Sequence, residues 1–290
     1  MIEKMEFGKT GHQSTRTIFG GASLWEVTQE EADRVLDILL KYNVNHIDTG
    51  STYGDSEKRI GAWMKNYRKD FFLATKADGR TYQTAKDELH QSLDRLKVDQ
   101  IDLWQMHELH TQEEWEEVFS AGGAIDAFVE AKEEGLVRFL GVTGHGLAAP
   151  KLHLKSLSEF DFDSVLLPYN YTMMKIPEYV TDFNSLEKTC LIKNVAIQTI
   201  KSIARRGKGL AKHKKYNTWY NPLDNEKAIY HAVSWVLGNP NVFLNTVGDI
   251  HLLETVLKAA SVMDEKPDNA TMEKDIEKYQ IEPLFPTDEI

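Results

Sequence analysis

The chain has 290 residues, of which 41% are hydrophobic and 27% charged, enough apolar side chains for a core of ordinary size. Its net charge of −11 argues against nucleic acid or an anionic membrane as a partner. No stretch approaches the ~20 apolar residues that span a bilayer, and the first residues lack the apolar core of a signal peptide. A single cysteine, Cys190, allows no internal disulfide, so we expect a reducing compartment, the cytoplasm.

Short β-rich runs alternate with helical patterns from end to end of the chain. Helices are expected from about residue 30 (with Thr28 and Glu31 as a capping box), from 56, over 85–96, over 113–134, weakly over 150–155, and over 251–260. The expected strands are 17–21, 44–48, 71–76, 101–107, 137–142, 164–168, 195–201 and 243–247.

Eight strands that alternate with helices predict an α/β fold, a (β/α)8 TIM barrel, rather than an open sheet. An open dinucleotide-binding sheet needs Gly-x-Gly-x-x-Gly after its first strand, and Phe19-Gly20-Gly21-Ala22-Ser23 does not supply it. We expect one domain over 1–290, with the barrel at about 17–260. A hairpin over 2–16, turning at 8–11, precedes the barrel, and a charged, proline-containing tail over 261–290 packs outside it.

Polar residues end three successive strands: Asp48, Lys76 and His107, and Tyr53 follows Asp48 by five residues. Taken singly, each has an ordinary structural explanation, such as a turn cap, a solvated lysine or a packed ring. Together they lie at the rim where barrel enzymes place their chemistry. A phenol has a pKa near ~10, and a neighbouring ammonium lowers it. We therefore expect Tyr53 to donate a proton to a carbonyl oxygen, with Lys76 tuning its pKa, Asp48 holding Lys76, and His107 orienting the carbonyl.

The segment from Ile47 to Gly61, with Asp48-Thr49 and Tyr53-Gly54-Asp55-Ser56-Glu57, resembles the signature of the aldo-keto reductases. The strands ending at Lys76 and His107 and the segment Gly141-Val142-Thr143 are also similar to that family, over about residues 5–260. The resemblance implies that Asp48, Tyr53, Lys76 and His107 form the catalytic tetrad. It also implies NADPH or NADH as cofactor. His110 lies past the strand end, so His107 is preferred, and because nothing completes a metal site with these two histidines we expect no metal.

The cofactor side is less well defined by the sequence. Seven basic and no acidic side chains lie between Lys201 and Lys215, starting where the seventh strand ends, a usual phosphate position in barrels. Lysines 212–215 are expected in solvent, and the long connection 202–224 is typical of a lid. The predicted cofactor contacts are Gly21, Ser23, Asp48, Thr143, Asn170, Lys201, Ser202, Arg205, Arg206, Gly248 and Asp249.

Some positions depart from the family that the chain resembles. Leu166 stands where a glutamine commonly holds the nicotinamide carboxamide, which leaves Asn170 as a candidate for that role, and Gly144 stands where asparagine is common. Lys201 replaces an aromatic residue that stacks on the nicotinamide. Asp249 would repel a 2′-phosphate, whereas Lys258, His251 or Arg206 would attract one, so these residues do not decide between the two nucleotides. The resemblance to the family favours NADPH, and NADH stays open.

Trp25, Tyr82, Trp219 and Tyr220 are predicted to line the substrate pocket, which favours a partly apolar carbonyl. The function that the sequence predicts is reduction of an aldehyde or ketone, with hydride from the nicotinamide and a proton from Tyr53. Two alternatives stay open: a nucleotide-binding redox sensor or regulatory subunit with little turnover, and a barrel hydrolase or isomerase that uses no nucleotide.

Overall fold

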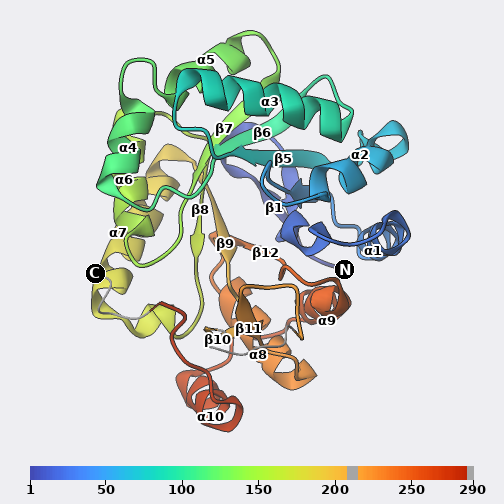
Figure 1. Cartoon of the computed structure of the whole chain (residues 1–290). Coiled ribbons are helices and arrows are strands. Elements are labelled where there is room, and N and C mark those ends of the chain that lie inside the picture. Colours follow the sequence, from blue (N-terminus) through green and yellow to red (C-terminus); the bar gives the residue numbers. More distant parts are fainter. Residues whose placement is uncertain (208–214, 286–290) are drawn as a thin grey trace.

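The computed structural model describes residues 1–207 and 215–285. Eight parallel strands close into a barrel with helices around it, and they pair in chain order until β12 meets β3 (Figure 1). The predicted (β/α)8 barrel is confirmed, as is the hairpin before it, formed by β1 (Lys4–Glu6) and β2 (Gln13–Thr15). The barrel strands are β3 (Thr17–Gly20), β4 (His46–Asp48), β5 (Phe72–Ala77), β6 (Ile101–Met106), β7 (Val137–Thr143), β8 (Ser164–Pro168), β9 (Ala196–Ile200) and β12 (Val242–Asn245).

Each expected strand overlaps an observed one. The largest differences are at β4, which begins at His46 rather than at residue 44, and at β12, which spans Val242–Asn245 rather than 243–247. β3 ends at Gly20 because a short 3-10 helix, η2 (Gly21–Leu24), starts there. The helices are α1 (Gln29–Lys41), α2 (Ser56–Tyr67), α3 (Tyr82–Leu96), α4 (Gln112–Phe119), α5 (Ala124–Glu133), α6 (Ala149–Glu159), α7 (Pro177–Lys193), α8 (Glu226–Leu237), α9 (Ile250–Ser261) and α10 (Asn269–Tyr279), with η3 (Met173–Lys175) before α7.

The single helix expected over 113–134 is wrong, because the chain forms α4 and α5 with a turn between them. Gly122 in this turn has φ +77°, a left-handed conformation that glycine adopts without a steric penalty. A Cβ on Gly123 would lie 2.3 Å from the carbonyl oxygen of Val118, so only glycine fits this close approach. The capping box expected at Thr28 and Glu31 is present at the start of α1.

The N-terminal hairpin closes one end of the barrel. Between its strands, η1 (Gly8–Thr10) follows Phe7, whose ring is fully buried. The Phe7 ring centroid lies 5.0 Å from that of Phe243 and 5.6 Å from that of Phe72, inside an apolar cluster of barrel residues. The hairpin therefore fills the amino-terminal end of the barrel, and the opposite end, where the strands finish, is left for a ligand site.

Two additions lie outside the barrel. A two-stranded antiparallel ribbon, β10 (Ala204–Gly207) and β11 (Tyr220–Pro222), follows β9, and the expected tail contains the helix α10, which packs on α8 (Figure 1). Residues 286–290 of the tail and Lys208, Lys212 and Lys214 of the basic run lie outside the described residues. In the part of the chain that the structure describes, no helix is both long and apolar enough to cross a bilayer.

Candidate active site

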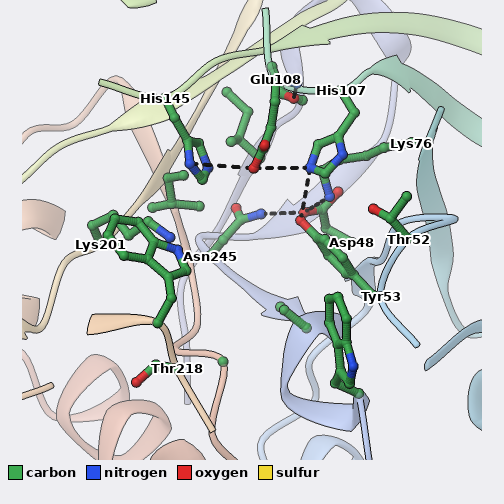
Figure 2. Close-up of a pocket in the computed structure, with 18 of the residues that line it drawn as sticks. Asp48, Thr52, Tyr53, Lys76, His107, Glu108, His145, Lys201, Thr218 and Asn245 are labelled. Atoms are coloured by element: carbon green, nitrogen blue, oxygen red, sulfur yellow. Dashed lines mark hydrogen bonds and ion pairs between the residues drawn. The ribbon is translucent and has the colours of Figure 1, made fainter. Parts of the chain in front are cut away.

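A cavity of about 610 Å³ lies at the carboxyl ends of the barrel strands (Figure 2). A residue in or directly after each barrel strand lines it, because parallel strands in a barrel end at the same rim. In chain order, the strand-end residues that line it are Gly20, Asp48, Lys76, His107, Thr143, Leu166, Ile200 and Asn245. The four residues predicted for proton transfer occupy one wall, and Lys201 with the 217–220 segment lies opposite (Figure 2).

The structure brings Asp48, Tyr53, Lys76 and His107 together. The buried Lys76 ammonium donates to Asp48 Oδ2 and to the Thr49 carbonyl oxygen, both at 2.7 Å, and lies 4.9 Å from the centre of the Tyr53 ring. The Tyr53 hydroxyl is 3.5 Å from Nε2 of His107. Burial lowers the pKa of Lys76, but Asp48 and Tyr53 more than offset it, so the pKa is raised and the side chain stays an ammonium.

Lys76 acts to lower the pKa of Tyr53, as the sequence predicts, but it does not decide the net direction of the shift. Burial raises the pKa of Tyr53, Lys76 opposes this, and the carboxylates of Asp48 and Glu108 add to the rise, so the net pKa lies above its usual range. The phenol is therefore protonated at neutral pH. A protonated, buried hydroxyl that faces a cavity is a hydrogen-bond donor to a ligand oxygen.

His107 is oriented by a carboxylate that the sequence did not point to. Nδ1 of its ring is 2.5 Å from Asp78 Oδ1, just beyond the end of β5, which turns Nε2 toward Tyr53 and the cavity. A neutral ring that donates from Nδ1 accepts at Nε2, whereas a protonated ring donates from both nitrogens. Asp78 therefore determines that Nε2, rather than Nδ1, is the ring nitrogen that a ligand meets.

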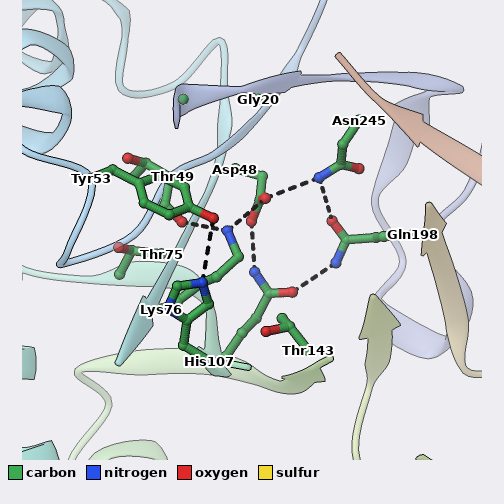
Figure 3. A network of polar contacts seen from close by, with 12 residues as sticks. Gly20, Asp48, Thr49, Tyr53, Thr75, Lys76, His107, Thr143, Gln198 and Asn245 are labelled. Carbon is green, nitrogen blue, oxygen red and sulfur yellow. Dashed lines mark hydrogen bonds and ion pairs between the residues drawn. The ribbon is translucent and has the colours of Figure 1, made fainter. Parts of the chain in front are cut away.

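A layer of buried amides supports the Asp48 carboxylate from inside the barrel (Figure 3). Gln105 donates to Asp48 Oδ1 at 2.7 Å, and Asn245 donates to Asp48 Oδ2 at 2.9 Å. Gln198 in turn donates to Gln105 Oε1 at 2.8 Å. Three strands far apart in sequence, β6, β9 and β12, thus hold the carboxylate that holds Lys76.

Replacing Gln198 by leucine is expected to lower the free energy of unfolding by about 1–3 kcal/mol, because Gln105 Oε1 then lies buried without this donor. Urea denaturation measures the change. Gln83→Leu, on the exposed face of α3, is the control and should change stability by less than about 0.5 kcal/mol. Equal effects of the two substitutions would contradict a structural role for the amide layer.

The opposite wall of the cavity contains Lys201, whose ammonium lies 4.7 Å from the centre of the Trp219 ring and 5.0 Å from that of Tyr220. Burial lowers the pKa of Lys201 to about 8, with Glu108 acting to raise it and Lys76 to lower it. Such cation–π contacts keep an ammonium among apolar atoms without a carboxylate partner. Lys201 therefore changes charge close to physiological pH.

Because a neutral amine reacts with acylating reagents and an ammonium does not, acetylation of Lys201 is expected to reach half its maximal rate near pH 8. The profile is measured by labelling with trace acetic anhydride over about pH 6–11, followed by mass spectrometry. This range includes the pKa of an ordinary lysine. The same lysine in the urea-unfolded chain is the control and should titrate near ~10.4. Coincident profiles in the two states would contradict the shift.

Several predicted cofactor and substrate residues line the cavity: Asp48, Thr143, Lys201, Gly248, Trp25, Trp219 and Tyr220. Gly21 and Ser23 lie behind the wall. A Cβ on Gly21 would meet Thr49 at 2.9 Å, and the Ser23 hydroxyl donates to the Gly20 carbonyl oxygen. The prediction that Tyr82 lines the substrate pocket is wrong. Tyr82 begins α3, and its hydroxyl donates to Glu130 away from the cavity.

The prediction that the residues directly after β9 contact the cofactor also differs from the structure. Arg205 and Arg206 lie on β10 and contact the C-terminal segment instead of the cavity, Arg205 through Gln280 at 3.4 Å and Arg206 through Glu282 at 3.8 Å. Ser202 lines a separate, much smaller cavity. The ribbon β10–β11 turns these side chains outward, so of the basic residues that the structure describes in this run, Lys201 is the one at the cavity. Lys215, expected in solvent, is largely exposed and pairs with Asp224.

Asn170 and Asp249 have structural partners that differ from those expected. Asn170 donates to the Lys201 carbonyl oxygen and accepts from Thr172 and the Met173 amide, so both ends of its side chain are occupied. Asp249 caps α9, where its buried carboxylate accepts from the amides of His251 and Asn217. Neither side chain is directed to a ligand in the described cavity.

Sequence reasoning missed Thr52, Glu108, His145 and Thr218, which also line the cavity. Glu108 directly follows His107, and His145 follows Thr143 by two residues, so proximity to predicted residues was the available signal. The Glu108 carboxylate lies 3.5 Å from His107 Nε2 and 3.4 Å from His145 Nδ1 (Figure 2). These contacts place an acidic group beside the Tyr53 hydroxyl.

Comparison with known proteins identifies the family. The model of the aldo/keto reductase family matches residues 16–271. The chain belongs to the aldo/keto reductase family. Aldo/keto reductases are NAD(P)H-dependent oxidoreductases, and the tetrad positions predicted from the sequence all lie within the matched range.

Among curated relatives, the uncharacterized oxidoreductase YqkF of Bacillus subtilis is 32% identical over 129 residues, covering 40% of each chain. The L-galactose dehydrogenase of Arabidopsis thaliana is 28% identical over 159 residues, covering 49% of each. The chain thus spans less than half the length of these relatives. Among solved structures, the holo form of an aldo-keto reductase from Bacillus halodurans matches with a TM-score of 0.70 and 20% identity over 99% of both chains. An aldo-keto reductase from Klebsiella pneumoniae in complex with NADPH has a TM-score of 0.68 and 14% identity, over 99% of this chain and 98% of that one.

Proposed function

We propose that this chain reduces an aldehyde or ketone to the alcohol with NAD(P)H, and that Tyr53 supplies the proton. The observation that carries the proposal is the position of the Tyr53 hydroxyl at the cavity wall, 3.5 Å from Nε2 of His107, with the Lys76 ammonium 4.9 Å from the centre of its ring. Reduction places negative charge on the carbonyl oxygen, and a positioned donor stabilises this charge as it develops.

A nicotinamide nucleotide bound in this cavity would supply the hydride for the carbonyl carbon. The carbonyl oxygen accepts a hydrogen bond from Tyr53 Oη and takes its proton as the hydride arrives. The phenolate that remains is stabilised by the Lys76 ammonium, which Asp48 and the Thr49 carbonyl oxygen hold in place. A proton from solvent then restores the phenol, and His107, fixed by Asp78, orients the carbonyl beside Tyr53.

The cavity suits the reactive end of a dinucleotide. Its volume of about 610 Å³ accommodates a nicotinamide and a small carbonyl compound, within the usual size of ligand sites. It extends from the tetrad to Gly248, which lines the far end of the cavity. NADPH is our proposed cofactor, with NADH the alternative because Asp249 places a carboxylate at the start of α9.

The proposal includes a single (β/α)8 domain, a small-molecule carbonyl partner and no metal, nucleic acid or membrane. It also includes a cytoplasmic location, which the single, buried Cys190 supports because no disulfide has to be maintained.

Titration with NADPH and NADH tests the nucleotide part of the proposal. Trp25 and Trp219 line the cavity, so binding is expected to quench their fluorescence. Oxidation of the bound nucleotide is then followed with a panel of aldehydes and ketones. Failure to bind either nucleotide would overturn the proposal in favour of a hydrolase or isomerase, and tight binding without turnover of any carbonyl would favour a redox sensor.

A further inference from the structure

Two charged residues at the cavity have an unusual backbone conformation. Among non-glycine residues that the structure describes, six have a positive φ, and four of them, Asn43, Lys97, Asn194 and Gln280, follow the helices α1, α3, α7 and α10. The other two are Glu108, with φ +50°, and Lys201, with φ +68°. Left-handed conformations of such residues cost energy and gather at functional sites. Both residues line the same cavity.

The two side chains have opposite charges but do not neutralise each other. Glu108 contacts His107, His110 and His145 at 3.3–3.5 Å, whereas Lys201 lies over the rings of Trp219 and Tyr220. Within the described residues, Lys201 forms no ion pair. An acceptor and a donor thus face the interior of one cavity from different walls (Figure 2).

This arrangement selects the chemistry of the ligand group. An anion would be repelled by Glu108, and a cation would be repelled by the Lys201 ammonium. A primary amide satisfies both, because its N–H groups donate to the carboxylate and its carbonyl oxygen accepts from the ammonium. The nicotinamide that the proposed function brings into this cavity has one such group, its carboxamide.

Several other side chains near this part of the cavity are apolar or already bonded within the protein. Leu166 presents an apolar side chain, and both ends of the Asn170 amide are bonded within the protein. The Asn245 amide donates to Asp48, and its Oδ1 is buried. The Thr143 hydroxyl, which accepts from the Glu108 amide, also lines the cavity, but a neutral hydroxyl binds an amide more weakly than the charged groups of Glu108 and Lys201 do.

We propose that Glu108 and Lys201 hold the nicotinamide carboxamide, with the carboxylate accepting from its N–H and the ammonium donating to its carbonyl oxygen. The inference rests on the proposed function. By fixing the carboxamide, the two residues fix the rotation of the nicotinamide ring, and with it the face that meets a carbonyl bonded to Tyr53.

The ionisation of the neighbouring groups agrees with these roles. Burial acts to raise the pKa of Glu108, but His110, His145 and His107 outweigh it, so the pKa lies below its usual range and the carboxylate is charged. Burial lowers the pKa of His145 well below its usual value, with Lys201 adding to this, so the ring that lies between them is neutral. Lys201, facing Glu108, Lys76 and His145, is an ammonium below about pH 8.

A pair of nucleotides that differ only at the carboxamide tests the proposal. In 3-acetylpyridine adenine dinucleotide phosphate a methyl group replaces the amide NH2, so it lacks the donor to Glu108. The protein is expected to bind NADP⁺ about tenfold or more tightly than this analogue, the effect of one hydrogen bond to a charged acceptor. Dissociation constants are measured by calorimetry, and the corresponding NAD⁺ pair is used if the protein binds only that form.

Variants of Glu108 carry the test further. Glu108→Gly removes the carboxylate and suits φ +50°, so the turn is expected to fold, and the preference for NADP⁺ over the analogue should fall to about onefold. Glu108→Gln keeps an uncharged acceptor and should restore part of the preference. Glu26→Gln, another carboxylate that lines the cavity, is the matched control and should keep the full preference.

Lys201→Met is expected to weaken the binding of NADP⁺ and of the analogue by the same factor, because both have the carbonyl group that Lys201 binds. It should also remove the loss of affinity that the unmodified protein shows as the pH rises through about 8, where the ammonium is lost. Two results would overturn the carboxamide assignment and leave the proposed function intact. In one, Glu108→Gly still prefers NADP⁺ over the analogue as strongly as the unmodified protein does. In the other, the unmodified protein binds both nucleotides equally well. Absence of any nucleotide binding would instead overturn the proposed function.

Discussion

Replacing Tyr53 by phenylalanine is expected to lower the rate of carbonyl reduction by a factor of about 10²–10⁴, the usual contribution of a positioned general acid. The substitution removes the hydroxyl that lies 3.5 Å from His107 and keeps the ring over Lys76. The cavity keeps its shape, so the dissociation constant for NADPH should be unchanged. Single-turnover kinetics, which separate the chemical step from product release, measure the effect.

The matched control is Tyr82→Phe. Tyr82 is the first residue of α3, and its hydroxyl bonds to Glu130 outside the cavity. We expect its kcat to stay within about twofold of the unmodified protein, since it touches no reacting group. A Tyr53→Phe variant that turns over as fast as Tyr82→Phe would remove Tyr53 from the mechanism.

Replacing Lys76 by methionine is expected to lower the free energy of unfolding by about 3–5 kcal/mol, because Asp48 then holds a buried charge without its cation. The amides of Gln105 and Asn245 still donate to this carboxylate, which places the effect at the lower end of that range. Carbonyl reduction should also be lost, since no ammonium remains to stabilise the phenolate. Urea denaturation followed by circular dichroism measures the stability.

Lys175→Met provides the comparison for this substitution. Lys175 pairs with Glu273 at 2.6 Å, but both side chains are about half exposed, and such pairs contribute less than about 1 kcal/mol. If both lysine variants lost the same stability, the Asp48–Lys76 pair would have no special structural role. A stable Lys76→Met variant with full activity would also remove Lys76 from the proposed mechanism.

The barrel and the meeting of Asp48, Tyr53, Lys76 and His107 were predictable because both follow from periodicity. Eight strands that alternate with helices, without the glycine-rich motif of an open dinucleotide-binding sheet, favour a barrel, and the strand ends of a barrel share one rim. A polar residue at a strand end is therefore placed in three dimensions by its position in the sequence. The catalytic roles of the four residues stay predictions that the variants above test.

Other features depend on contacts that no local pattern carries. Gln105 and Gln198 meet across 93 residues only because the closed barrel brings β6 and β9 to one interior layer. The direction of Arg205 and Arg206 depends on β10 pairing with β11 and on the segment after α10, neither of which the basic run signals. Lys76 lowers the pKa of Tyr53, but the net shift also depends on burial, Asp48 and Glu108, which the sequence does not reveal.

The hairpin that ends in Phe7 has a kinetic consequence. With the amino-terminal end of the barrel filled by the Phe7 cluster, reactants exchange through the strand-end mouth, where the cavity lies. A nucleotide and a carbonyl compound that bind in this cavity would therefore enter and leave from the same side. We expect the reactant that lies deeper to bind first and leave last, and product-inhibition patterns of an ordered mechanism would show this.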